Sequence, residues 1–123
     1  MTLDPTSMFS ALGHTTRLRI VMLLLDQPEL CVCELTHLLG ATQPHMSRHL
    51  AQLREVGLVM DRRNGLWNYY RINPELPAWA YKVLRETAAG LTAREPFLTD
   101  ARALARMPNE VDAPRCDVVV RRA

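Results

Sequence analysis

The fold is decided by residues 42–72, TQPHMSRHLAQLREVGLVMDRRNGLWNYYRI, and the first half of this stretch predicts a helix. Thr42 can cap that helix with its hydroxyl group, and Pro44 falls in the first turn, where a missing backbone N–H costs nothing. The apolar side chains that repeat at helical spacing are Met46, Leu50 and Leu53. We therefore predict a helix that begins after Thr42, buries this apolar face and ends at Gly57.

The second half of the stretch predicts a β-hairpin. Residues 58–62 and 67–72 read as strands on either side of Asn64 and Gly65, the pair favoured at the centre of a type I′ turn. A turn centred on that pair fixes the partners across the strands. The expected partners are Val59 with Tyr70 and Met60 with Tyr69.

Two further helices are expected before this stretch. Residues 15–25 follow a helical apolar pattern, with His14 or Thr15 as the cap. Residues 31–39 predict a second helix that stops at Gly40. Because a short turn containing glycine joins this helix to the helix after Thr42, the pair is typical of a helix-turn-helix. With the hairpin as its wing, the predicted fold class is mainly α, a winged helix-turn-helix.

After the hairpin, a helix is expected over residues 74–90, with Asn73 as its cap and Gly90 at its end. Its broad apolar stripe consists of Leu76, Trp79, Ala80, Val83, Leu84 and Thr87. Such a stripe can pack within the chain, but on so small a domain it favours a homodimer interface. We expect residues 1–91 to form the DNA-binding and dimerisation domain. Residues 92–123 are expected to form a C-terminal tail with a short helix around residues 99–107.

Composition limits the function classes. The 123 residues allow one domain with a tail, and no apolar run approaches the ~20 residues of a membrane span. The first ten residues lack the features of a signal peptide, so we expect a cytoplasmic protein without a membrane partner. An odd cysteine count of three argues against a disulfide framework. No polar side chains converge as a catalytic group would require, so neither catalytic residues nor a catalytic cofactor are expected, and the chain is not predicted to be an enzyme.

Positive charge is concentrated in the segment where DNA contact is predicted. Residues 48–71 hold five arginines against two carboxylates, between nearly neutral flanks. An ordinary polar surface is the alternative, but polar side chains at the start of a second helix, together with a basic wing, favour contact with double-stranded DNA. The predicted DNA-binding residues are Thr42, Gln43, His45, Ser47, Arg48, His49, Gln52, Arg62, Arg63 and Asn64.

A second candidate site is the pair Cys31 and Cys33 in the segment ELCVCEL. Thiolates select soft metal ions, and Cys31 lies at a helix start, where the dipole favours the thiolate, although Glu29 and Glu34 oppose this. The alternative is that two small cysteines fill the flank of a helix. A zinc site between C-terminal helices is not expected, because none of the four histidines lies there.

Residues 8–90 closely resemble the arsenic-responsive repressors of the ArsR/SmtB-type family. The matching segments include ALG at 11–13, TRLRI at 16–20, ELCVCEL at 29–35, SRHL at 47–50, LREVGLV at 53–59 and RRNG at 62–65. The resemblance implies a homodimer that represses an arsenic-resistance operon and is released by trivalent arsenic or antimony bound at Cys31 and Cys33. Some members carry a third cysteine where this chain has Thr36, and many have a capping aspartate where it has His14. A thiol-based redox-sensing repressor of the same fold is the alternative.

The spacing of the two cysteines predicts how an inducer acts. Residues i and i+2 of a regular helix point about 200° apart, so Cys31 and Cys33 cannot share one ion while both are helical. Binding is therefore expected to unwind or prevent the first turn of the helix over residues 31–39. Because trivalent arsenic accepts three thiolates, Cys116 in the tail is a candidate third ligand. The alternative is that Cys116 takes no part.

Overall fold

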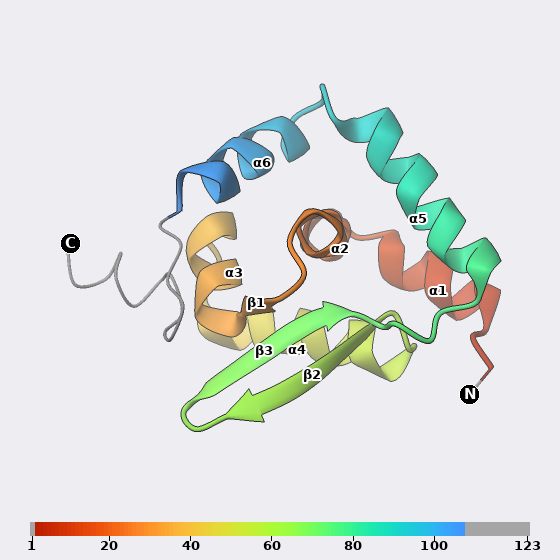
Figure 1. Ribbon diagram of the computed structural model, residues 1–123, viewed down its shortest axis with the longest axis horizontal. Helices are drawn as coiled ribbons and strands as arrows, with labels where there is room; N and C mark the ends of the chain where they lie inside the picture. The colour runs from red at the N-terminus through yellow and green to blue at the C-terminus, as the bar shows by residue number, and fades with distance from the viewer. Residues whose placement is uncertain (1, 108–123) are drawn as a thin grey trace.

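The computed structural model describes residues 2–107, and helix α2 (Thr15–Asp26) lies at the centre of the fold. Its consecutive residues 20–25 are all buried, which is expected of a helix with neighbours on every side. The other helices and the sheet surround α2, which is seen end-on in Figure 1. The surrounding helices are α1 (Pro5–Leu12), α3 (Val32–Leu39), α4 (Gln43–Glu55), α5 (Ala78–Leu91) and α6 (Phe97–Arg106).

The predicted helix-turn-helix is confirmed as α3 and α4, which pack against each other. Gly40 ends α3 with a φ of 64°, a left-handed conformation that a glycine adopts without steric cost. Thr42 caps α4 by accepting the backbone N–H of His45 at 3.4 Å. The inner face of α4 buries Met46, Leu50 and Leu53 as the sequence predicts. His14 caps α2 through its Nδ1, which accepts the N–H of Thr16 at 3.1 Å.

The hairpin is present, but its predicted register is wrong. Strands β2 (Val59–Asn64) and β3 (Trp67–Ile72) pair with Val59 opposite Ile72 and Asn64 opposite Trp67, so Gly65 and Leu66 are the central turn residues. Among the described residues only glycines have positive φ, with 61° at Gly65. A type I′ turn would need positive φ at Asn64 as well, whereas type II′ needs it only at the first central residue. The register differs by two residues, so each side chain keeps its predicted face.

Two elements were not predicted. Helix α1 is capped by Asp4, which accepts the N–H of Ser7 at 2.9 Å. Strand β1 (Leu30–Cys31) pairs with β3 and makes a three-stranded sheet in the order β1-β3-β2. A strand of two residues is too short to produce an alternating pattern, so only the tertiary structure reveals it.

The start of α5 also differs from the prediction. The helix begins at Ala78, and Asn73 does not cap it. Asn73 is instead buried, where its Nδ2 donates to the carbonyl of Gly57 and its Oδ1 accepts the N–H of Glu75, both at 2.9 Å. It therefore ties the end of the hairpin to the end of α4. Gly90 lies inside α5, which continues to Leu91.

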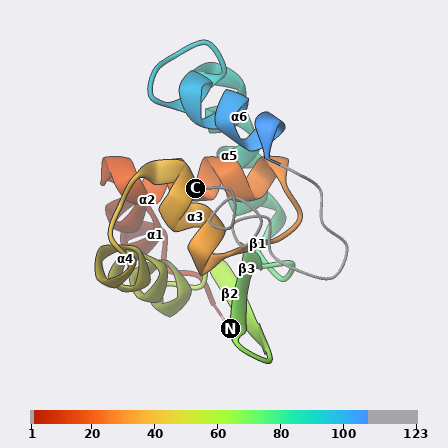
Figure 2. The same cartoon turned by 90° about the vertical axis from the view of Figure 1, so that its left-hand side faces the viewer.

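Helix α6 packs against α2 and α3 and agrees with the short helix predicted around residues 99–107. Its Asp100 side chain is 4% exposed and accepts two hydrogen bonds from Arg19 of α2, at 2.7 and 2.8 Å. In both views α6 and the hairpin lie at opposite ends of the molecule (Figures 1 and 2). None of the described helices is long and apolar enough to cross a membrane.

Candidate functional site

The two cysteines meet at the beginning of α3. Cys31 is the N-cap residue with an extended backbone (φ −85°, ψ 162°), and Cys33 is the second residue of the helix. Because Cys31 itself is not helical, the two side chains converge, and their Sγ atoms lie 2.6 Å apart. This agrees with the expectation that the two cysteines cannot converge while both are helical. The change in the first turn on ligand binding stays a prediction.

Cys31 is closed off from the solvent, beside a buried carboxylate. The residue has no exposed surface, and Glu34 beside it is 3% exposed. Glu34 Oε1 accepts the backbone N–H of Cys31 at 2.8 Å, the contact of a capping box. Burial raises the pKa of the Cys31 thiol to about 11, which outweighs the lowering effect of the backbone N–H groups of Glu34 and Cys33. The helix start therefore does not make Cys31 a thiolate, contrary to the sequence expectation.

The donors near this pair are few. Within residues 2–107 there is no cluster of three or more His, Cys, Asp or Glu side chains that could hold a metal ion. Thr36 stands where some family members have a third cysteine, and its hydroxyl donates to the carbonyl of Val32 at 2.8 Å. Cys116 lies outside the described residues. The sulfur atoms of Cys31 and Cys33 are soft donors that lie side by side, which suits a thiophilic ion.

The predicted DNA-reading surface of α4 divides into two parts. The exposed residues at its start and along its outer face are Thr42, Gln43, His45, Ser47 and Arg48. His49 and Gln52, which were predicted to belong to the same surface, contact Arg17 of α2. Arg17 Nη1 donates to Gln52 Oε1 at 2.5 Å and lies 3.4 Å from His49 Nδ1. Its Nε donates to the carbonyl of Ala11 at 2.6 Å.

His49 is held in a positively charged corner. Burial lowers its pKa first, and the nearby charges of His14, Arg17, His45 and Arg48 lower it further. The His14 ring lies 4.6 Å from the His49 ring between centroids. Arg17 was not among the predicted site residues. No local pattern could have identified it, because its partners are 32 and 35 residues away in the sequence.

The basic residues predicted for the wing have different surroundings. Arg63 and Asn64 are exposed near the tip of the hairpin. Arg62 is also exposed, but its guanidinium donates twice to the carboxylate of Glu29, at 2.6 and 2.7 Å. It also lies 4.6 Å above the centre of the Tyr69 ring. Glu29 is thus a further residue of this surface, noted in the sequence only for its charge near the cysteines.

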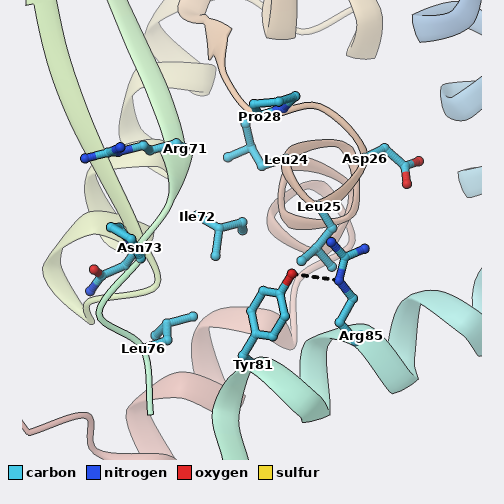
Figure 3. A pocket seen from close by; sticks show the side chains of 11 residues that line it. Leu24, Leu25, Asp26, Pro28, Arg71, Ile72, Asn73, Leu76, Tyr81 and Arg85 are labelled. Atoms are coloured by element: carbon cyan, nitrogen blue, oxygen red, sulfur yellow. Dashed lines mark hydrogen bonds between the residues drawn. The ribbon is translucent and has the colours of Figure 1, made fainter. Parts of the chain in front are cut away.

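A groove of about 610 Å³ lies between the end of α2, the end of β3 and α5 (Figure 3). Its walls combine apolar side chains such as Leu24, Leu25 and Ile72 with the polar side chains of Arg71 and Arg85. Arg85 Nε donates at 2.9 Å to the hydroxyl of Tyr81, which lies one turn earlier on α5. The groove contains neither cysteine, so it is separate from the thiol pair.

Known proteins match this arrangement. Residues 14–61 match the family model described as bacterial regulatory protein, arsR family. The chain is 46% identical, over 91% of its length and 86% of the relative's, to the arsenic resistance transcriptional regulator ArsR1 of Pseudomonas putida. It is 51% identical, over 67% of its length and 70% of the relative's, to the arsenical resistance operon repressor of Escherichia coli.

Solved structures agree with the winged-helix fold. HlyU from Vibrio cholerae is 29% identical with a TM-score of 0.63, over 70% of this chain and 89% of that one. The transcriptional repressor BigR from Xylella fastidiosa is 33% identical with a TM-score of 0.60, over 71% of this chain and 82% of that one. On the length and identity of the match to ArsR1, this chain belongs to the ArsR family of bacterial regulatory proteins.

Proposed function

We propose that this protein is a homodimeric repressor of an arsenical-resistance operon, which leaves its operator DNA when trivalent arsenic or antimony binds Cys31 and Cys33. The observation that carries the proposal is the contact of the two sulfurs, 2.6 Å apart, at the first turn of α3. Helix α3 packs directly against α4, the helix predicted to read DNA. The names of the relatives ArsR1 and the operon repressor of Escherichia coli support arsenic as the inducer.

The chemistry of the ligand suits a buried thiol. Trivalent arsenic in neutral water is the uncharged acid As(OH)₃. Each thiol that bonds to arsenic gives its proton to a departing hydroxyl group, and one water molecule leaves. Two thiols therefore take up arsenic without bringing net charge to Cys31, whose surface is fully buried. A divalent cation brings no hydroxyl group to accept the thiol protons, so both protons would have to be released to the solvent.

DNA binding is assigned to the exposed start of α4 and to the wing. Gln43, His45 and Arg48 are placed to reach base edges or phosphates, and Arg63 and Asn64 to reach the backbone. A symmetric dimer presents two such helices. The operator should therefore be an inverted repeat with half-sites about one helical turn apart.

Cys116 is proposed as the third arsenic ligand, because residues 2–107 provide only two thiols at the site. The test compares the unmodified protein with Cys116→Ser, using arsenite affinity and the number of arsenic–sulfur bonds from X-ray absorption. Loss of one sulfur neighbour and weaker binding are expected. Identical affinity and bond count would show that Cys116 is not a ligand.

The experiment that tests the proposed function is a parallel titration of the protein on a DNA fragment from upstream of its own gene. Arsenite, antimonite, zinc, cadmium and peroxide are added separately, and DNA release is followed by fluorescence anisotropy. Arsenite and antimonite should release the DNA at the lowest concentrations. The variants Cys31→Ser and Cys33→Ser should bind the DNA within a fewfold of the unmodified protein but lose the release.

The same sulfur contact supports a second candidate, a redox-sensing repressor. In that case one peroxide molecule oxidises the two thiols to a disulfide and is reduced to two water molecules. Release by peroxide with disulfide formation, and no release by arsenite, would favour this candidate over the proposed one. Failure of the DNA fragment to bind at all would contradict both.

A further inference from the structure

Four side chains that connect the thiol pair with the wing lie on one face of the sheet. In an antiparallel sheet, residues directly opposite each other project to the same face, and so do residues two apart along a strand. Cys31 is opposite Tyr69, and Tyr69 is opposite Arg62 on its other side. Glu29, two residues before Cys31, extends this row.

The row is connected by direct contacts. Two nitrogens of the Arg62 guanidinium donate to the carboxylate of Glu29. Nε donates to Oε2 at 2.7 Å, and Nη2 donates to Oε1 at 2.6 Å. The same guanidinium lies over the Tyr69 ring at 4.6 Å. The two-pronged contact and the ring together fix both the place and the plane of the guanidinium. Arg62 on the wing is therefore held by the residues that precede and oppose Cys31.

We propose that Glu29 is a positioning residue, which sets the DNA-facing guanidinium of Arg62 and makes it respond to a ligand on Cys31 and Cys33. This inference rests on the proposed function and adds the path by which the ligand reaches the wing. The path runs through β1 and the sheet, in addition to the packing of α3 on α4.

A bound ion would act on this row by moving the sulfur of Cys31. Two bonds of about 2.3 Å at an angle near 100° hold their sulfurs roughly 3.5 Å apart, with the zinc–sulfur length as a guide. In the structure the sulfurs are 2.6 Å apart, and Cys31 has no exposed surface. An ion must therefore push the two sulfurs apart, and because Cys31 is fully buried in β1, we infer that part of this movement is taken up by a shift of β1. Because β1 is paired with β3 at Tyr69, the shift reaches the contacts that hold Arg62.

The ion pair is not proposed as a source of stability. The side chains of Arg62 and Glu29 are 54% and 26% exposed, and exposed pairs contribute little to folding. The pair instead gives the Arg62 guanidinium a defined orientation. We expect that orientation to differ between the protein with and without a bound ligand. The quantity to measure is therefore the coupling between arsenite and DNA.

The test measures operator affinity with and without saturating arsenite for the unmodified protein, Glu29→Gln, Arg62→Lys and the double variant. The ratio of the two affinities is the arsenite response. We expect either single change to lower this ratio at least tenfold, and the double change to lower it no further, because both remove the same link. Operator affinity without arsenite should change by less than tenfold in Glu29→Gln, and for the two variants that alter Arg62 it is measured as the reference of each ratio, because Arg62 is itself a predicted DNA contact.

Asp61→Asn is the matched control. Asp61 is the neighbour of Arg62 on β2 and accepts a hydrogen bond from Arg54 at 3.1 Å, but it faces the other side of the sheet. Its arsenite response should equal that of the unmodified protein. Arsenite affinity of each variant without DNA is measured separately and should be unchanged. Hydrogen exchange of residues 59–72 should change on arsenite addition in the unmodified protein and not in Glu29→Gln.

Two outcomes would overturn the inference. One is a full arsenite response in Glu29→Gln, and the other is a double variant in which the two losses multiply independently. Failure of the proposed function is distinguishable, because it would appear in the unmodified protein as an absence of arsenite binding or release. The inference fails on its own if the unmodified protein responds and the variants respond equally.

Discussion

Arg17 and His49 show how single side chains fix the position of α4. Arg17 joins the carbonyl of Ala11 to Gln52 of α4 and also contacts His49. A polar surface predicted to face DNA is thus partly used to hold the helix against the rest of the fold. Because these contacts are intramolecular, changes at His49 and Gln52 should affect the stability and placement of α4 as well as DNA binding.

Folding stability should depend on pH through His49. Its pKa in the folded protein is below the ordinary value of 6.5, because of burial and then of nearby positive charge. The unfolded chain therefore binds a proton more readily. This contribution to the free energy of unfolding is complete above pH 6.5 and is lost as the pH falls through the folded-state pKa.

Urea unfolding between pH 5 and 8 measures this effect. The variant His49→Gln should show a smaller loss of unfolding free energy on acidification than the unmodified protein. Equal slopes for the two proteins would contradict the role assigned to His49.

The helix α4 and the hairpin β2–β3 present different chemistry to DNA. The start of α4 offers Gln43 and His45, which can pair with base edges, whereas the hairpin tip offers Arg63, a cation suited to phosphates. Helix α4 packs directly against β2, and β1 extends the hairpin to a three-stranded sheet. Sequence preference should therefore depend on α4 and salt dependence on the hairpin.

Gln43→Ala and Arg63→Ala test this division. Gln43→Ala should relax preference at particular bases, with a loss of about 1–3 kcal/mol against the correct site only. Arg63→Ala should weaken binding to all sequences and reduce the salt slope by about one unit for each phosphate that the arginine neutralises. Affinity is measured on operator and scrambled DNA at several salt concentrations. A uniform loss in Gln43→Ala would refute base reading by that residue.

At the scale of the whole molecule, α6 packs the C-terminal part of the described chain against the core. The Asp100 side chain is 4% exposed and fully engaged with Arg19, whose guanidinium is held in its charged form by the contact and has a raised pKa. On α5 the side chains of Trp79 and Tyr81 are exposed, at 44% and 39%, whereas Ala80 and Leu84 are buried. Helix α6 is thus fixed within the chain by an ion pair, and the α5 dimer interface stays a prediction.

Asp100→Asn should lower the free energy of unfolding by about 1–3 kcal/mol, because it leaves a partly buried guanidinium without its charged partner. Urea denaturation measures the change. Asp61→Asn is the control, since it breaks an ion pair whose arginine is 50% exposed and should cost less than about 1 kcal/mol. Equal effects of the two changes would show that α6 is not fastened by Asp100.

The dimer prediction over residues 74–90 is tested with Trp79→Glu. A charge in the centre of the proposed α5 interface should convert the dimer to a monomer in light scattering. Leu66→Glu is the matched control, because Leu66 is 92% exposed at the hairpin tip and should leave the mass unchanged. A dimer that survives Trp79→Glu would place the interface elsewhere.

The sequence by itself determined the helix-turn-helix, the presence of the hairpin and the proximity of a thiol pair to the DNA-reading helix. These features depend on local signals: helical spacing of Met46, Leu50 and Leu53, a glycine at the end of a helix, and two cysteines one residue apart. Local conformation and the burial of one helix face follow from neighbours within a few residues. For this reason these segments could be predicted without the fold, whereas the start of α5 and the centre of the hairpin turn could not.

Only the tertiary structure decided how these parts work together. The turn is centred on Gly65-Leu66 and not on Asn64-Gly65, in a sheet whose strand β3 pairs with β2 on one edge and with β1 on the other. Cys31 is an extended N-cap, not a helical residue, because it pairs with Tyr69 across the sheet. Glu29 and Arg62 are 33 residues apart, as Arg19 and Asp100 are 81 apart. Such contacts depend on how complete elements pack, and no spacing along the chain records them.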